Sequence, residues 1–273
     1  MKSFKLLLIA VVVAGAIAGL LLLSSGDGGT TASGQDDKLF DRLETELSEQ
    51  WQSVDAWDRG LFEASLDRLY QNEERLGSGY KVLADMVAND ACNLLHQSMM
   101  GEFGNAACSK QKVDQYNDDL KYFLSKTTGY KTNKKVKQMQ DTYKLYTDII
   151  SFIQKNKNRT LPPNFDFETG KYNDFKAHET SIMTSIKNYR DNSHFEYLSN
   201  ITELNSGLDQ VEANLPKAKT TFKNSLAKEI IAAFEQHEKT SEHSTKLARL
   251  NREFIERYGS QNDLRDYVLR YNN

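Results

Sequence analysis

The stretch VKQMQDTYKLYTDIISFI (136–153) is typical of an amphipathic helix. Its apolar side chains recur at three- and four-residue steps, at Val136, Met139, Tyr143, Tyr146, Ile149, Ile150 and Ile153. Residues at that spacing share one face of an α-helix, whereas a half-buried strand alternates at every second residue. The segment is therefore predicted to be a helix that packs along one side.

The same periodicity extends along the chain in both directions. Further helical stripes are predicted over residues 39–70, 80–95, 113–123, 175–211, 222–258 and 264–271. Breaks are predicted at Gly77-Ser78-Gly79, at residues 101–109, at Gly129, at the proline-containing loop 158–170, at residues 214–216 and at Gly259. Because long helices joined by short turns pack antiparallel, we expect an all-α fold, an elongated antiparallel helical bundle of about four or five main helices.

An apolar run without charge occupies residues 6–23. As a helix it would be about 27 Å long at a rise of ~1.5 Å per residue, close to the ~30 Å of a bilayer's hydrocarbon core. Lys2 and Lys5 precede it, and positive flanks stay in the cytoplasm. We expect a cytoplasmic flank at 1–5 and a transmembrane signal anchor at 6–23. The alternative is a signal peptide that is cleaved, which would leave a secreted protein.

The expected anchor places the rest of the chain on the extracytoplasmic side, in the periplasm or outside the cell. Residues 24–35 are rich in glycine, serine and threonine and are predicted to be a flexible linker. Residues 36–273 are then the exported helical-bundle domain. Gly15 and Gly19 form a G-x-x-x-G motif, a spacing that lets two membrane helices approach closely and is compatible with a homodimer.

Charge is balanced overall but uneven along the chain. With 35 basic and 38 acidic residues the net charge is −3, which lacks the basic surplus that nucleic-acid binding requires. Residues 36–110 carry 15 acidic and 7 basic side chains, whereas residues 111–157 carry 5 and 10. Such segments either help neighbouring helices pair or are ordinary solvated faces. In the basic segment, Lys134, Lys135 and Lys137 are the candidate partner-binding residues.

Cys92 and Cys108 flank the glycine-containing turn. An exported body permits oxidation, so a disulfide between them is predicted, which would stabilise the fold by ~3 kcal/mol in the loop-entropy model. Free thiols are the alternative. A metal site would need more ligands than these two cysteines and the intervening His96 supply.

The histidines do not form a recognisable catalytic pattern. A metalloprotease helix needs histidines four residues apart, but His237 and His243 are six apart, roughly 240° around a continuous helix. Asp191-x-x-His194 stands alone, whereas di-metal bundles need paired E-x-x-H motifs. The chain also has no nucleophile elbow, Walker loop or dinucleotide fingerprint. We therefore predict no catalytic residues, no metal and no cofactor, and expect that the protein is not an enzyme.

Two functions fit these features. The first is a membrane-anchored, non-catalytic scaffold or protein-interaction module of the cell envelope, which binds another envelope protein. The alternative is an extracytoplasmic, sensor-like bundle that binds a ligand. A ligand binder is expected to have a pocket inside the bundle with converging polar groups. A scaffold is expected to have a filled core and an exposed apolar or charged face.

Overall fold

The computed structural model describes residues 36–272, and every regular element in that range is a helix. The all-α prediction is thereby confirmed. The predicted flank, transmembrane segment and linker, residues 1–35, lie outside the described residues. None of the helices between residues 36 and 272 has the length and apolar character needed to cross a bilayer.

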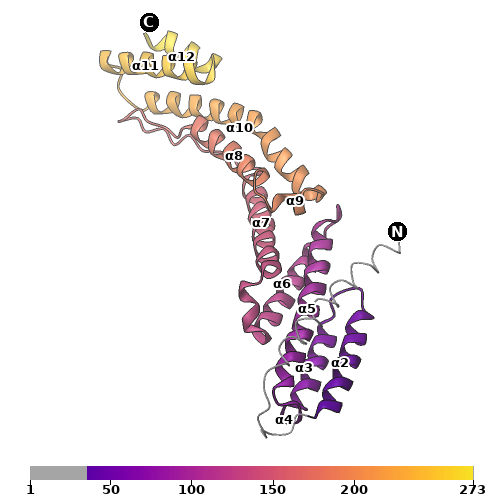
Figure 1. The fold of residues 1–273 in the computed structure, drawn as a ribbon. Helices are drawn as coiled ribbons and strands as arrows, with labels where there is room; N and C mark the ends of the chain where they lie inside the picture. The colour runs from indigo at the N-terminus through magenta and orange to yellow at the C-terminus, as the bar shows by residue number, and fades with distance from the viewer. Residues whose placement is uncertain (1–35, 273) are drawn as a thin grey trace.

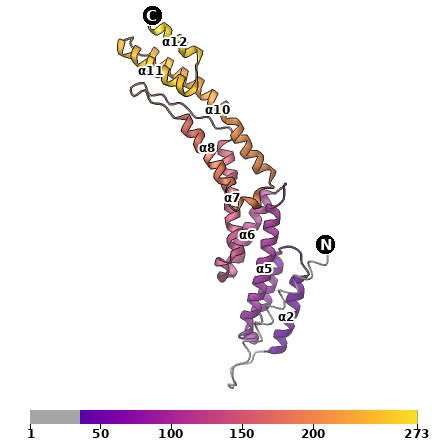
Figure 2. The same cartoon turned by 45° about the horizontal axis from the view of Figure 1, so that its top comes forward.

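The described chain is an elongated array of helices (Figures 1 and 2). The N-terminal helices gather at one end, and the last two helices lie at the other end. In chain order the elements are α2 (Asp37–Gln52), α3 (Arg59–Tyr70), α4 (Glu73–Leu76), α5 (Gly79–Phe103), α6 (Lys110–Lys126), the 3-10 helix η1 (Thr128–Thr132), α7 (Lys134–Asn156), α8 (Phe175–Arg190), α9 (Phe195–Leu198), α10 (Thr202–Glu235), α11 (Ser241–Tyr258) and α12 (Asn262–Asn272).

Buried apolar side chains form two separate cores. The N-terminal core extends from α2 to the first half of α10 and includes Leu43, Leu83, Val87, Leu95, Met99, Phe123, Ile149 and Leu208. The C-terminal core joins the second half of α10 to α11, α12 and the loop before α8, and includes Phe175, Phe222, Ile230, Phe234, Leu250, Phe254 and Leu264. Because α8 and α10 each contribute side chains to both cores, these two helices connect them.

Pro216 lies inside α10 and does not end it. The predicted break at residues 214–216 is therefore wrong. A proline within a helix removes one backbone hydrogen bond and clashes with the carbonyl four residues earlier, which bends the helix. The ribbon of α10 changes direction partway along its length (Figure 1). Packing against a core on each side of the proline holds the helix together.

Three predicted long helices are interrupted in the structure. The helix expected over 39–70 is divided into α2 and α3, because the side chain of Asp58 accepts a hydrogen bond from the Leu61 amide and starts a new helix. The helix expected over 222–258 ends at Glu235, and Thr240 caps α11 in the same way. The helix expected over 175–211 is divided between α8, α9 and α10. Apolar residues continue across the first and third of these breaks and conceal them, whereas residues 236–246 contain no apolar side chain.

Candidate functional site

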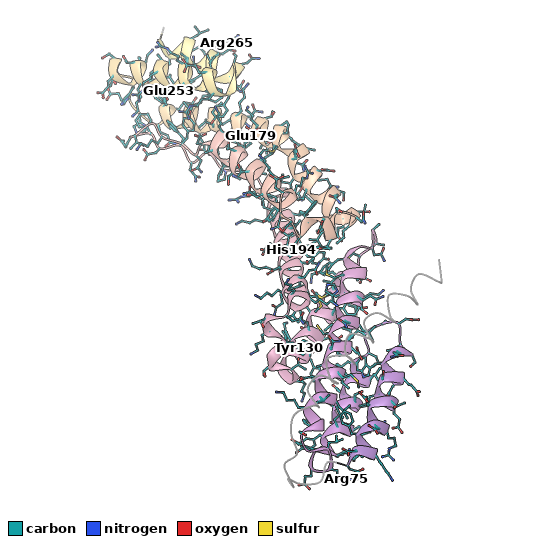
Figure 3. The ribbon with its side chains drawn as sticks, in the orientation of Figure 1. Arg75, Tyr130, Glu179, His194, Glu253 and Arg265 are labelled. Atoms are coloured by element: carbon teal, nitrogen blue, oxygen red, sulfur yellow. The ribbon has the colours of Figure 1, made fainter. Side chains whose placement is uncertain are left out.

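A surface hollow of about 400 Å³ lies between the first turns of α7 and the segment around α9. We call it the α7–α9 groove. Its lining residues are Lys134, Lys137, Gln138 and Asp141 from α7, together with Ser193, His194, Glu196 and Tyr197. His194 is located near the middle of the elongated molecule (Figure 3). The groove therefore opens on the flank of the rod and not at one of its ends.

The start of α7 is unusually cationic. Asn133 caps the helix by accepting a hydrogen bond from the Lys135 amide at 2.8 Å, and the first turn contains no acidic residue. The positive end of the helix dipole disfavours cations there by roughly 0.3–1 kcal/mol each. Helix stability therefore does not explain why Lys134, Lys135 and Lys137 occupy these positions.

The three predicted partner-binding lysines have different surroundings. Lys134 and Lys137 line the groove, and residues three apart lie on one face of a helix. Neither side chain forms an ion pair or hydrogen bond with a residue that the structure describes. The Lys135 ammonium instead lies 2.5 Å from Asn93 Oδ1 on α5. Lys135 therefore attaches α7 to α5, and only the other two lysines remain available at the groove.

A hydrogen bond between α5 and α7 supports the polar wall of the groove. His96 Nε2 on α5 lies 2.8 Å from Gln138 Oε1, and since that amide oxygen can only accept, the histidine donates. Glu196 raises the pKa of the neighbouring Tyr197 hydroxyl, and Gln138 opposes that rise. The hydrogen bond joins α5 to α7, and α9 packs against both helices, so the wall is held in place.

His194 lies between a hydroxyl and a carboxylate in the groove. Its Nδ1 is 3.4 Å from Thr142 Oγ1 and its Nε2 is 3.8 Å from Asp141 Oδ2. The arrangement resembles a nucleophile, base and orienting acid, but Thr142 is 0% exposed. A nucleophile must reach its substrate, so this hydroxyl serves to position His194. Within residues 36–272, no three His, Cys, Asp or Glu side chains are grouped to hold a metal ion.

No family model, curated protein or solved structure matches this chain. Its function is therefore inferred from its own residues and their contacts.

A second surface hollow, of about 380 Å³, was not anticipated from the sequence. It is lined by Trp57, Asp58, Arg59, Lys112, Gln115, Tyr116 and Asp119. Burial raises the pKa of Asp119, and the neighbouring Trp57 and the charge of Arg59 oppose that rise. Its cations already have partners, since Arg59 lies 3.8 Å from Asp119 and Lys112 lies 3.5 Å from Glu102. The cations of this hollow are therefore in ion pairs, whereas Lys134 and Lys137 of the α7–α9 groove form none with the described residues.

The predicted disulfide is not formed, because Cys92 and Cys108 are free thiols in the structure. Cys92 is buried within α5, and Cys108 lies in the turn beyond its end. The helix from Cys92 to Phe103 is about 16 Å long at ~1.5 Å per residue, whereas bridged cysteines have Cα atoms within ~7 Å. Burial, with added repulsion from Glu102 and Glu203, raises the pKa of Cys108 to about 11. The thiol therefore stays protonated near neutral pH and is a poor nucleophile.

His237 and His243 approach each other although the sequence placed them on different sides of one helix. Their ring centroids are 6.1 Å apart because the chain turns between α10 and α11. Phe167 from the preceding loop stacks on His237, with centroids 3.6 Å apart and planes at 13°. His237 Nδ1 lies 2.7 Å from the backbone carbonyl oxygen of Ala233, and His243 Nδ1 lies 2.7 Å from that of Glu238. The three rings of Phe167, His237 and His243 thus pack the loop that precedes α8 against the α10–α11 turn.

Proposed function

We propose that this protein is a non-catalytic helical interaction module of the cell envelope. In this proposal residues 6–23 hold it at the membrane, and the helical body binds another envelope protein. The observation that carries the proposal is the arrangement of two filled cores end to end along α10. A rod of this kind buries its apolar stripes internally and leaves long polar helix faces for contact with a partner.

The form of the two hollows favours a protein partner over a small ligand. Both lie at the surface between helices and are bordered mainly by charged or polar side chains. A site for a small molecule usually encloses most of its ligand between apolar walls. The groove instead offers side chains to a partner that approaches from outside.

Two further observations support the absence of catalysis in this proposal. The hydroxyl beside His194 belongs to Thr142, which is completely buried. The Cys108 thiol has a pKa of about 11 because of burial and two nearby glutamates. Neither group is placed or ionised as an active nucleophile would be.

The proposal is tested by crosslinking in intact membranes followed by capture through a tag at the C-terminus. We expect the chain to fractionate with membranes, its body to be cleaved by protease added outside, and one envelope protein to be enriched. A variant with His178→Ala, on α8 and outside both hollows, is expected to keep its partner and its cellular role. Loss of that role in a folded, membrane-bound variant that still captures its partner would instead indicate a catalytic or ligand site.

A further inference from the structure

We infer that one end of the rod contacts the surface of the lipid bilayer through Tyr70 and Val82. This end consists of α4 with the last turn of α3 and the first turn of α5, and we call it the α4 end. The contact rests on the proposed function, in which residues 6–23 lie in the membrane. It adds the orientation of the body, whose C-terminal core then points away from the bilayer.

The start of the described chain is attached to the α4 end. The Asp36 amide donates a hydrogen bond to the Arg75 carbonyl at 3.0 Å, and Arg75 Nη2 lies 2.5 Å from Asp36 Oδ2. Arg75 is located at one end of the molecule, and Arg265 is located at the opposite end (Figure 3). The polypeptide therefore joins the folded body at the α4 end.

The length of chain before Asp36 limits how far the α4 end can lie from the membrane. Twelve residues, 24–35, separate the predicted membrane segment from Asp36. A chain of that length spans at most about 43 Å even when fully extended. The rod is longer than this, since the 34 residues of α10 alone measure about 51 Å at ~1.5 Å per residue. Chain length therefore confines the α4 end to the bilayer and leaves the C-terminal core free to lie far from it.

The α4 end carries exposed apolar side chains. Tyr70, the last residue of α3, is 71% exposed, and Val82, in the first turn of α5, is 41% exposed. Three other large apolar side chains of the described residues are also exposed, namely Met183, Ile255 and Leu269. Those three belong to α8, α11 and α12, so they are remote from the attachment point. Exposure alone selects no partner, but the attachment at Asp36 brings only Tyr70 and Val82 to the lipid.

The chemistry of this end suits a neutral lipid surface. Tyrosine is favoured at the boundary of a membrane because its ring is apolar and its hydroxyl is polar. Anionic lipids attract clusters of about four to eight Lys or Arg residues, whereas Arg68 and Arg75 are already paired with Glu46 and Asp36. A short tether also keeps the α4 end at a roughly millimolar effective concentration, so two side chains suffice for the contact. We therefore expect it to form on phosphatidylcholine and to be insensitive to salt.

Energy transfer from one site on the full chain to labelled lipid headgroups tests the orientation. The chain, with Cys92→Ala and Cys108→Ala, is placed in phosphatidylcholine nanodiscs that contain rhodamine-labelled lipid. A fluorescein donor is attached at Glu73→Cys in α4 or at Arg265→Cys in α12, two exposed positions. We expect strong transfer from residue 73 and little from residue 265. Circular dichroism checks that each labelled chain stays folded.

A second comparison tests the two contact residues. Tyr70→Ser/Val82→Ser is expected to lower transfer from residue 73 at least about twofold, because the freed end can then move out over the ~43 Å that the chain allows. The matched control is Ile255→Ser/Leu269→Ser, which makes the same apolar-to-polar change at the opposite end and is expected to leave this transfer unchanged. Both variants are expected to remain in the nanodiscs.

Several outcomes would overturn the inference. Equal transfer from residues 73 and 265 would mean that the rod lies along the bilayer. Unchanged transfer in Tyr70→Ser/Val82→Ser, or an equal loss in Ile255→Ser/Leu269→Ser, would show that Tyr70 and Val82 do not make the contact. A contact that needs anionic lipid, or that is lost in high salt, would indicate attraction by charge instead.

Membrane fractionation and partner capture distinguish failure of this contact from failure of the proposed function. If wild type fractionates with membranes and captures a protein, but residue 73 shows no more transfer than residue 265, only the contact at the α4 end is wrong. If wild type does not fractionate with membranes, the proposed function itself fails.

Discussion

Gly207 of α10 is so close to α7 that a Cβ atom at this position would lie 2.7 Å from Cδ1 of Ile153 and 3.0 Å from its Cγ2. Ile153 is branched at Cβ and itself nearly buried, so its side chain has few other rotamers to adopt. The two helices therefore depend on the absence of a side chain at residue 207 for their close contact.

Gly207→Ala is expected to destabilise the fold. Overpacking a core usually costs about 1–3 kcal/mol, more than the roughly 1 kcal/mol that alanine gains over glycine within a helix. Urea unfolding followed by circular dichroism measures the change. Gly101→Ala in α5 is the control, because a Cβ there meets nothing within 4 Å, and it is expected to be neutral or stabilising. Equal stability of the two variants would refute the tight contact.

Asp58→Ala is expected to lower stability by about 1 kcal/mol, because α3 loses its N-cap. The Asp58 side chain accepts a hydrogen bond from the Leu61 amide at 3.0 Å. Asp55→Ala removes the same charge from an exposed position in the same loop and is expected to have little effect. The comparison uses the denaturant midpoint of each variant. If Asp55→Ala proved as harmful as Asp58→Ala, charge and not capping would be responsible.

Tyr172→Phe is expected to leave stability unchanged or raise it by up to about 1 kcal/mol, since a buried hydroxyl without a partner is unfavourable. The Tyr172 hydroxyl has no hydrogen-bond partner among the described residues, and burial raises its pKa. Tyr143→Phe provides the contrast, because it removes a 3.0 Å hydrogen bond to Asp114. Thermal unfolding measures the stability of both variants. A clear loss of stability in the Tyr172→Phe variant would contradict the absence of a hydrogen-bond partner for this hydroxyl.

Cys108 is expected to react slowly with alkylating reagents in the folded protein. With a pKa of about 11, its thiolate fraction at pH 8 is about two orders of magnitude below that of an ordinary cysteine of pKa ~8.5. Mass spectrometry after timed treatment with iodoacetamide measures the rate, and unfolding in urea should restore it. The same shift predicts that stability declines as the pH rises from about 9 towards 11, because the unfolded thiol ionises first. Recovery of a Cys92–Cys108 disulfide would contradict the structure directly.

Much of the fold follows from local sequence, because the apolar period and the glycine breaks act within a few residues. The stripe from Val136 to Ile153 lies in one helix, and Gly259 ends α11 with a positive φ of 75°. The missed breaks depend on polar caps such as Asp58 and Thr240, and at Asp58 the chain is redirected without a change in the apolar period. Hydrophobic spacing alone therefore overestimates helix length.

The site was only partly predictable for a related reason. The run of lysines that contains Lys134 and Lys137 is visible as local charge, and both residues line the groove. His194 and Tyr197 follow them by more than fifty positions, and they reach the groove only because the short helix α9 packs against α7. No pattern of residue spacing in the sequence predicts such a tertiary contact. The different role of Lys135, compared with Lys134 and Lys137, likewise follows only from its contact with Asn93 in the folded chain.

The bend in α10 affects where the C-terminal core lies relative to the N-terminal core. From Pro216 to Glu235 the helix is about 28 Å long at ~1.5 Å per residue, and it carries the side chains on which α11 and α12 pack. A change of only about 10° at the proline would therefore sweep the tip of that arm through roughly 5 Å. The direction in which the C-terminal core points thus depends on the geometry at Pro216 together with the packing of α8 along α10.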